Sequence, residues 1–363
     1  MLAPRPPLTA VAASALVLLG AVCATPPKAP PPSAETKPPP DARAQVEALV
    51  LRLYRAVESL EPEKLEDTMT PEVVAIGLGP GDFFNSRPAL LEELRQQLVP
   101  IGLKGETLTI DHERPSVAVA ADHRSAWFFD RPLVTRERPN RPLQRYRPRV
   151  TGHLVFDQGW RLDALHVSLP VSNDTLYAAG SDKRLTAPED PQVVKGKGTE
   201  QLVGLTRRVL DDLKTKVERT SDADAVVLIG TDAAEVFEGG AAFKKMARPL
   251  VAQAKKSGFS FSIEGGPRAS LAPGGQSGWV IANVAMTYGT PKGPRTLVPF
   301  RSLWIFAEEK GLWSLVSEHQ SVALRPEQRE SALPQEIPVD PPDAGRPKAS
   351  ARKDAGVEVR PYD

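Results

Sequence analysis

The stretch Trp160–Leu169, WRLDALHVSL, has a counterpart later in the chain, Trp313–Val322, WSLVSEHQSV. In each stretch a tryptophan is followed six residues later by a histidine, and the two stretches lie 153 residues apart. Further landmarks recur in the same order at a spacing of 152 or 153: Gly77 and Gly230, Phe84 and Phe237, and Trp127 and Trp279. This spacing is far longer than a solenoid repeat, so the sequence predicts one whole domain present twice, each copy with its own core.

Each copy is expected to begin with helices and to continue as antiparallel strands. In the first copy, apolar residues at helical spacing predict helices over 42–60 and 88–98. Strand-like segments follow, and the turn at 157–159 introduces the last of them. The second copy repeats this order, beginning with a helix over 199–219. The order is typical of an α+β fold in which helices pack on one face of a curved antiparallel sheet.

The landmark residues resemble those of the SnoaL-like branch of the nuclear transport factor 2-like superfamily. They are Ile76-Gly77 with Phe84, Ala126-Trp127 and Gly159–Pro170 in the first copy, and Ile229–Asp232 with Phe237, Gly278-Trp279 and Trp313–Val322 in the second. The resemblance covers almost all of both copies and neither tail. It implies two cone-shaped domains, and a sheet bent around helices in this way leaves a cavity at its open end. Superfamily members include polyketide cyclases, isomerases and many proteins with no known reaction, so the fold alone does not fix the function.

Composition divides the chain into six segments. The segments outside the repeats are rich in proline or poor in large apolar residues, which is typical of linkers and disordered tails. The predicted segments are a signal peptide at 1–24, a disordered proline-rich linker at 25–41, SnoaL-like domain 1 at 42–173, a linker at 174–198, SnoaL-like domain 2 at 199–325 and a disordered tail at 326–363.

The N-terminus has the features of an export signal. Arg5 supplies a positive charge, and Ala10–Val22 is an apolar run of signal-peptide length. Val22-Cys23-Ala24 resembles a small-residue cleavage site. The alternative is a bacterial lipoprotein with Cys23 lipidated, although Gly20-Ala21-Val22 departs from the pattern that precedes the lipidated cysteine in such proteins. We therefore expect an exported protein of the periplasm, cell envelope or extracellular space, attached to a membrane only if Cys23 is lipidated.

Composition and spacing argue against several kinds of site. The chain has 46 Lys+Arg against 45 Asp+Glu, so no basic surface for nucleic acid is expected. Cys23 is the only cysteine, which leaves the mature domains without a disulfide or a thiol nucleophile. Neither metal-ligand spacing shared by both copies nor a phosphate-binding glycine loop is present. We therefore expect neither a metal nor a cofactor.

The last strand of each copy carries the candidate binding residues. Strict alternation places His166 and Ser168 on an uncharged face with Trp160, and it places His319 and Ser321 on the matching face of the second copy. We expect these faces to line the cavities. Tyr54, on the apolar stripe of the first helix, is a further candidate cavity residue.

These candidate residues have two interpretations. A histidine with a pKa of about 6.5 suits ligand binding or proton transfer near neutral pH, whereas a buried histidine with a hydrogen-bond partner is structural. Tyr54 is either a donor to a ligand or a core residue. An isomerase would also need a carboxylate in the cavity, but alternation places Asp163 on the face opposite His166, and no other carboxylate can be assigned to either cavity.

Trp127 and Trp279 lie on predicted strands that are apolar on both faces, which is typical of strands covered on both sides. Members of the superfamily commonly dimerise through the outer sheet face. We therefore predict that the two copies pack sheet to sheet as a pseudo-dimer within one chain. The alternative is that the linker covers one of these faces.

The leading prediction is a non-enzymatic module for small-molecule binding or interaction, with a small apolar molecule as the expected ligand. The alternatives are an isomerase-like or cyclase-like enzyme that uses the cavity of domain 1, and a structural protein of the cell envelope. A cavity that holds an ionisable group beside a donor favours an enzyme, and an apolar or filled cavity favours a binder.

Overall fold

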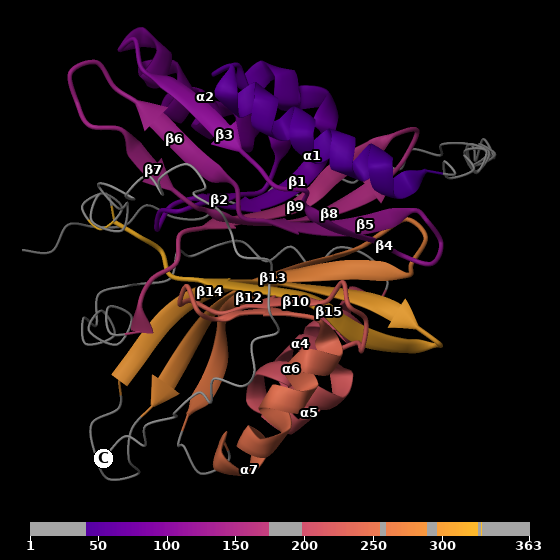
Figure 1. The fold of residues 1–363 in the computed structure, drawn as a ribbon. Helices are drawn as coiled ribbons and strands as arrows, with labels where there is room; N and C mark the ends of the chain where they lie inside the picture. Colours follow the sequence, from indigo (N-terminus) through magenta and orange to yellow (C-terminus); the bar gives the residue numbers. More distant parts are fainter. Residues whose placement is uncertain (1–40, 174–197, 255–258, 289–295, 326–327, 329–363) are drawn as a thin grey trace, which may run out of the picture. The chain divides into compact units, whose positions relative to one another are not determined.

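The computed structural model describes residues 41–173, 198–254, 259–288, 296–325 and 328. All of them belong to one compact unit. The proposed signal peptide, Cys23, the proline-rich linker, most of the inter-domain linker and nearly all of the C-terminal tail lie outside the described residues. The fold class is α+β with two curved sheets, as predicted (Figure 1).

Copy one begins with a helix that packs on a sheet. The helix forms because Val46, Leu49, Val50 and Leu53 recur at helical spacing, and all four are buried. The elements of copy one are α1 (Ala42–Glu58), the 3-10 helix η1 (Pro62–Thr68), β1 (Met69–Ile76), β2 (Phe83–Phe84), α2 (Arg87–Leu103), β3 (Thr107–Asp111), β4 (Ser116–Val119), β5 (Ser125–Asp130), β6 (Leu133–Glu137), β7 (Gln144–Tyr146), β8 (Arg149–Phe156) and β9 (Trp160–Ser168).

As far as the structure describes it, copy two repeats this order without the small additional sheet of copy one, and its strands from β12 onward are longer. Its elements are α4 (Thr199–Asp211), α5 (Leu213–Arg219), β10 (Val227–Ile229), β11 (Val236–Glu238), α6 (Gly240–Ala247), the 3-10 helix η2 (Arg248–Leu250), α7 (Val251–Ala254), β12 (Ser260–Leu271), β13 (Ser277–Tyr288), β14 (Thr296–Glu309) and β15 (Leu312–Ser321). The helix expected over 199–219 is two helices, because Asp212 adopts an extended conformation and caps α5.

The two six-stranded sheets have the same topology. Their orders are β2-β1-β9-β8-β5-β4 and β11-β10-β15-β14-β13-β12. In each sheet the strand after the first helices runs parallel to the last strand, and the other pairs are antiparallel. Copy one has a further three-stranded sheet, β3-β6-β7. It is separated from the main sheet at Pro115, Pro132 and Pro148, since proline has no N–H to donate to a neighbouring strand.

The last strand of each copy contains an extra residue that changes its faces. His153 pairs with Ala164, but Leu154 pairs with Leu162, so Asp163 has no partner of its own across the ladder. In copy two the corresponding extra residue lies between Leu315 and Ser317. Such a bulge moves every later side chain to the opposite face of the strand. Leu162 therefore packs in the core of copy one, whereas Ala164 lies on the outer face.

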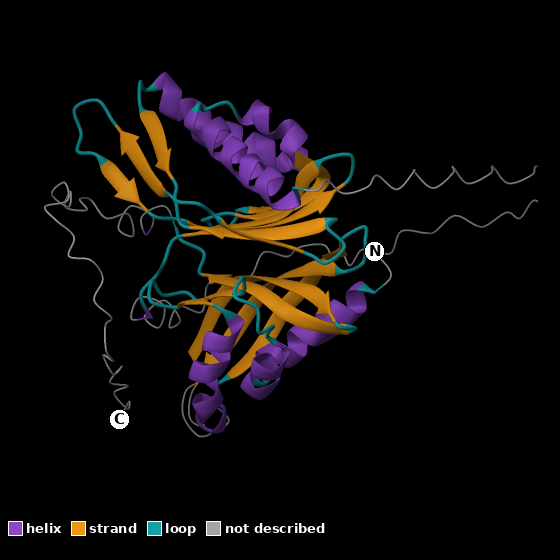
Figure 2. Ribbon diagram, turned by 45° about the vertical axis from the view of Figure 1, so that its right-hand side comes forward, coloured by secondary structure: helices purple, strands orange, loops and turns teal. Residues whose placement is uncertain are grey.

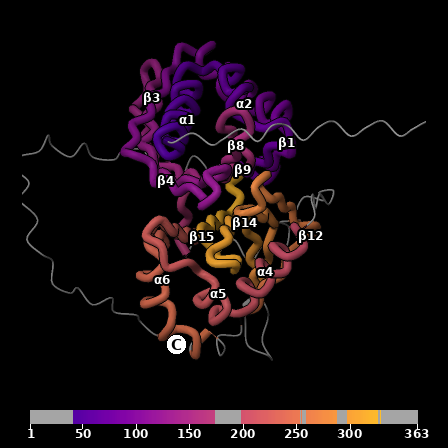
Figure 3. Tube along the Cα trace, turned by 90° about the vertical axis from the view of Figure 1, so that its right-hand side faces the viewer, coloured from indigo at the N-terminus to yellow at the C-terminus, as the bar shows by residue number. Residues whose placement is uncertain are grey.

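In each copy the helices cover one face of the sheet (Figure 2), and the other faces of the two sheets contact each other. Ile76, Trp127 and Ala164 of copy one pack there with Trp279 and Ile305 of copy two. This contact accounts for the strands that are apolar on both faces. Figure 3 shows β9 beside β14 and β15, where the cross-copy hydrogen bonds described below are formed.

Candidate functional site

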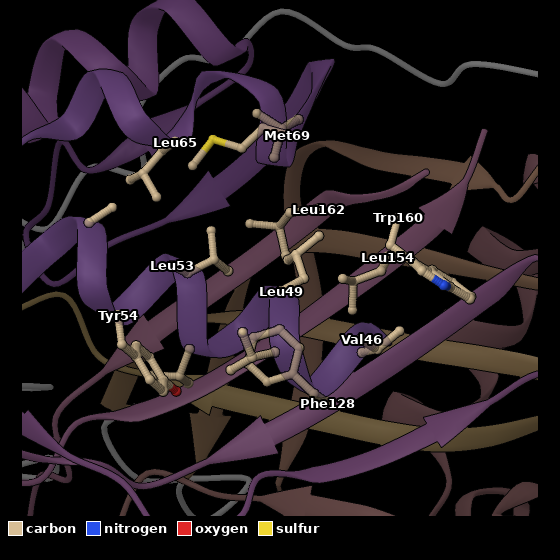
Figure 4. Packing of buried hydrophobic residues seen from close by; sticks show 14 of the residues in the cluster. Val46, Leu49, Leu53, Tyr54, Leu65, Met69, Phe128, Leu154, Trp160 and Leu162 are labelled. Carbon is tan, nitrogen blue, oxygen red and sulfur yellow. The ribbon is translucent and has the colours of Figure 1, made fainter. Parts of the chain in front are cut away.

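The cone of copy one contains a cavity of about 520 Å³. This volume lies within the roughly 300–1,000 Å³ that is usual for small-molecule sites. Apolar side chains from α1, α2 and the inner face of the sheet form most of its wall, among them Leu53, Val57, Leu65, Met69, Phe84, Leu94, Phe128, Leu162, Leu165 and Val167. Figure 4 shows part of the adjoining core, with Leu53, Met69 and Leu162 projecting between the helices and the sheet.

Several polar side chains that line this cavity have partners in the protein. Asp82 accepts a hydrogen bond from the backbone N–H of Gly79 at 2.6 Å. Arg136 donates to Glu106 at 2.6 Å, and Gln97 donates to Glu93 at 2.6 Å. The wall therefore presents mainly apolar surface to a ligand.

Tyr54 lies on the wall of this cavity. Its hydroxyl donates to Asp130 Oδ2 at 2.9 Å, and Asp130 Oδ1 accepts from the backbone N–H of Arg131 at 2.7 Å. Burial raises the pKa of the Asp130 carboxyl. It also raises the pKa of the Tyr54 hydroxyl, and the Asp130 carboxylate adds to that effect. Tyr54 is among the residues that line the cavity, whereas Asp130 is not.

Sequence reasoning missed Asp130. The strand Ser125–Asp130 is buried along its whole length, so it shows no alternation from which the inward face could be identified. The available signal was local: Asp130 stands directly before Arg131-Pro132, where the sheet divides.

Copy two has its own cavity, of about 560 Å³. Its apolar wall includes Val209, Phe261, Met286 and Phe300. Its polar lining residues include Lys216 and Gln320, both of which contact a buried carboxylate. Glu318 forms an ion pair with Lys216 and accepts from Trp304 Nε1 and from Gln320 Nε2, each at 2.9 Å.

Strict alternation along the last strand would place Glu318 on the face opposite His319, away from the expected cavity face. The bulge before Ser317 turns Glu318 and Gln320 toward the inner face of the sheet. Asp163 was likewise expected on the face opposite His166. As the bulged residue, it instead accepts from Trp279 Nε1 of the other copy at 2.6 Å, on the same outer side as His166.

The predicted cavity histidines and serines lie in the contact between the two sheets. His166 Nε2 is 2.7 Å from Ser321 Oγ, and His319 Nε2 is 2.7 Å from Ser168 Oγ. All four side chains are buried. The prediction that they face the cavities is wrong, because strict alternation does not hold across the bulges.

The two imidazole rings stack, with their centroids 3.9 Å apart and their planes 17° apart. Burial holds the pKa of both histidines well below the usual range, and the guanidinium groups of Arg149 and Arg301 lower both further. His166 also lowers the pKa of His319. Both rings are therefore neutral near pH 7, which suits a structural role and disfavours proton transfer to a ligand.

Two arginines join the copies reciprocally. Arg149 Nη1 donates to the carbonyl of Gly230 in copy two at 2.8 Å. Arg301 Nη2 donates to the carbonyl of Gly77 in copy one at 2.8 Å. Gly77 and Gly230 are equivalent in the repeat, so this contact has the self-complementary pattern of a two-fold interface.

The SnoaL-like domain family matches residues 46–172 and 210–325, which together make up more than half of the chain. The protein belongs to the SnoaL-like family. One matched region lies in each copy, so the sequence and the fold both show the tandem arrangement of this SnoaL-like protein.

Solved structures similar to this SnoaL-like protein each match about one copy. A putative scytalone dehydratase from Novosphingobium aromaticivorans is 13% identical, covers 34% of this chain and 80% of its own, and has a TM-score of 0.31. An NTF2-like protein of unknown function from Pseudomonas putida is 17% identical, covers 37% and 90%, and has a TM-score of 0.32. A putative dehydratase from Streptomyces avermitilis is 18% identical, covers 36% and 96%, and has a TM-score of 0.30. No curated protein matches the chain.

Within the described residues, the SnoaL-like protein has no group of three or more His, Cys, Asp or Glu side chains placed to hold a metal ion. Among the helices described, none is both long and apolar enough to cross a membrane.

Proposed function

We propose that this SnoaL-like protein binds a small apolar molecule in the cavity of copy one. The observation that carries the proposal is the apolar wall of a cavity of about 520 Å³. Removing apolar surface from water contributes about 25 cal/mol per Å², so such a wall favours a ligand that is itself apolar. A role in binding rather than catalysis fits the position of the buried Asp130 carboxyl, which is outside the cavity lining.

The ligand is sought by native mass spectrometry of the purified protein, and its site is tested by filling the cavity. Leu94, on α2, lines the cavity, and Leu94→Trp is expected to weaken binding of diphenylhexatriene, a fluorescent hydrocarbon, at least tenfold by occupying its space. Leu103 lies on the same helix but is 83% exposed, so Leu103→Trp is the matched control and should bind as the wild type does. Unchanged binding by Leu94→Trp would contradict the proposal.

A second candidate function is an isomerase-like or cyclase-like reaction in the same cavity. The observation that favours it is the buried Tyr54–Asp130 pair, a donor beside an ionisable group. The recovered ligand would be incubated with the protein in D₂O. Deuterium appearing at carbon with the wild type and not with Asp130→Asn would support catalysis, and no incorporation with either would support simple binding.

We also propose that the protein is exported, and that it is attached to a membrane only if Cys23 is lipidated. The apolar run Ala10–Val22 after Arg5 supports export. Intact mass and N-terminal sequencing of the protein from the producing cells should show cleavage near Cys23, and palmitate labelling that Cys23→Ser abolishes would establish lipidation. A full-length N-terminus retained inside the cell would contradict export. Empty cavities in an envelope-bound protein would favour the structural alternative.

A further inference from the structure

The two cavities differ at two equivalent positions on the last strand. Leu165 and Val167 line the cavity of copy one. The residues 153 positions later are Glu318 and Gln320. Gln320 and Lys216 line the cavity of copy two, and Glu318, outside the lining, contacts both of them; these three residues are called the polar floor. The two copies therefore share their fold and their contact surface, but they differ at inward-facing residues of the last strand.

The polar floor contains an ion pair between Lys216 and Glu318. Glu318 is 3% exposed and is held by Lys216, Trp304 and Gln320. A buried ion pair is often less stabilising than apolar residues of similar volume. Copy one builds the same sheet with leucine at the equivalent position. A function in binding accounts for the ionic residues of copy two better than a function in stability does.

The floor can offer hydrogen bonds to a neutral group. A lysine ammonium has three N–H donors, of which the ion pair with Glu318 occupies one. Gln320 donates its amide N–H to Glu318, and its oxygen accepts from no described group. Lys216 is already neutralised by Glu318, and the other charged residues of the lining are the acidic Asp211, Asp212 and Glu235. An anionic ligand would therefore be repelled.

We propose that the cavity of copy two binds a neutral molecule with an apolar ring system and a carbonyl or hydroxyl oxygen. The rings would pack against Phe261, Met286 and Phe300, and the oxygen would contact Lys216 or Gln320 on the floor. The site is separate from the apolar cavity of copy one, so one chain carries two binding sites of different chemistry.

The methionines allow each cavity to be observed separately. Met69 lines the cavity of copy one, Met286 lines that of copy two, and Met246 is 39% exposed and lines neither. The full-length protein would be labelled with ¹³C at the methionine methyl groups and titrated with Nile red, a neutral dye with a ring carbonyl. The Met286 signal is expected to shift saturably. No saturable shift of Met286, or a shift confined to Met69, would overturn the proposal.

A double variant tests the floor itself. Lys216→Met with Glu318→Leu gives copy two the leucine of copy one and leaves no buried charge unpaired. Loss of a hydrogen bond to a charged donor should weaken Nile red binding at Met286 about tenfold. Binding of diphenylhexatriene, which has no oxygen, should not weaken. Equal affinity of wild type and variant for Nile red would overturn the proposal.

A second variant keeps the test decisive if the double variant does not fold. Gln320→Val restores the residue that copy one carries as Val167, with no change in charge. It should weaken Nile red binding about threefold while leaving the Met69 and Met246 signals in place. Unchanged affinity in this variant would also count against the proposal. Because Met69 reports on copy one, this result is independent of ligand binding in that cavity.

Discussion

At the scale of single residues, the cross-copy contact is set by buried polar side chains that pair with side chains of the other copy. His166 and His319 stack on each other, and each contacts a serine of the other copy. Buried imidazoles next to Arg149 and Arg301 are stable only while neutral. Acid should therefore destabilise this contact more than it destabilises contacts on the protein surface.

The free energy of unfolding is expected to fall as the pH drops below about 6.5. The unfolded chain has ordinary histidines with a pKa of about 6.5, whereas the folded pKa of His166 and His319 is lowered. The unfolded state then binds protons first. The stabilisation is complete above pH 6.5 and is lost toward the folded pKa, by about 1.4 kcal/mol per pH unit for each histidine.

Urea unfolding at pH 7.5 and 5.5 measures this dependence. The double variant His166→Gln with His319→Gln should lose most of the pH dependence, because glutamine does not titrate. His112 is exposed, and His112→Gln should unfold with the pH dependence of the wild type. The prediction fails if the double variant keeps the full slope.

At the scale of elements, the sequence predicts the order of helices and strands well because apolar periodicity and the internal repeat report the same order. Bulges carry no such signal. Asp163 adds one residue to β9, and every side chain after it changes face. The bulge in β9 therefore places His166 and Ser168 on the outer face of the sheet and not in the cavity. The bulge in β15 turns Glu318 inward, which strict alternation does not predict. Tyr54 was placed on the cavity side because a helix has no comparable irregularity.

The break between α4 and α5 depends on one side chain. Asp212 accepts from the backbone N–H groups of Lys214 and Thr215 at 3.3 and 3.1 Å, which caps α5. Asp212→Ala is expected to lower the free energy of unfolding by about 1 kcal/mol, measured by urea denaturation. Asp211→Ala, at an exposed neighbour that caps no helix, is the control and should change stability little. A loss equal in the two variants would show that the cap is unimportant.

At the scale of the whole molecule, we propose that the two copies form a pseudo-dimer in solution through the outer faces of their sheets. Each copy supplies an arginine to a turn of the other, and Val171 donates its backbone N–H to Thr231 while Leu324 donates to Leu78. These two backbone pairs are equivalent in the repeat. The pattern supports one cooperative folding unit.

Placing a charge in the contact tests this proposal. Ile305 is fully buried between the sheets, so Ile305→Asp buries an unpaired carboxylate and should cost more than about 2 kcal/mol. The Met69 and Met286 methyl signals should be lost together on heating if the copies unfold as one. Leu312 is 59% exposed, and Leu312→Asp should have little effect. A stable Ile305→Asp protein would mean that this face is open to solvent.

Covalent fusion changes what the two halves are free to become. In a homodimer encoded by a single gene, every mutation appears in both subunits, so the two active faces must change together. Here the paired positions His166 and His319 still match, while Leu165 and Glu318, one residue before them, have diverged. A duplicated gene can thus keep the outward-facing residues of a strand matched for assembly, while its inward-facing residues diverge toward two ligand specificities.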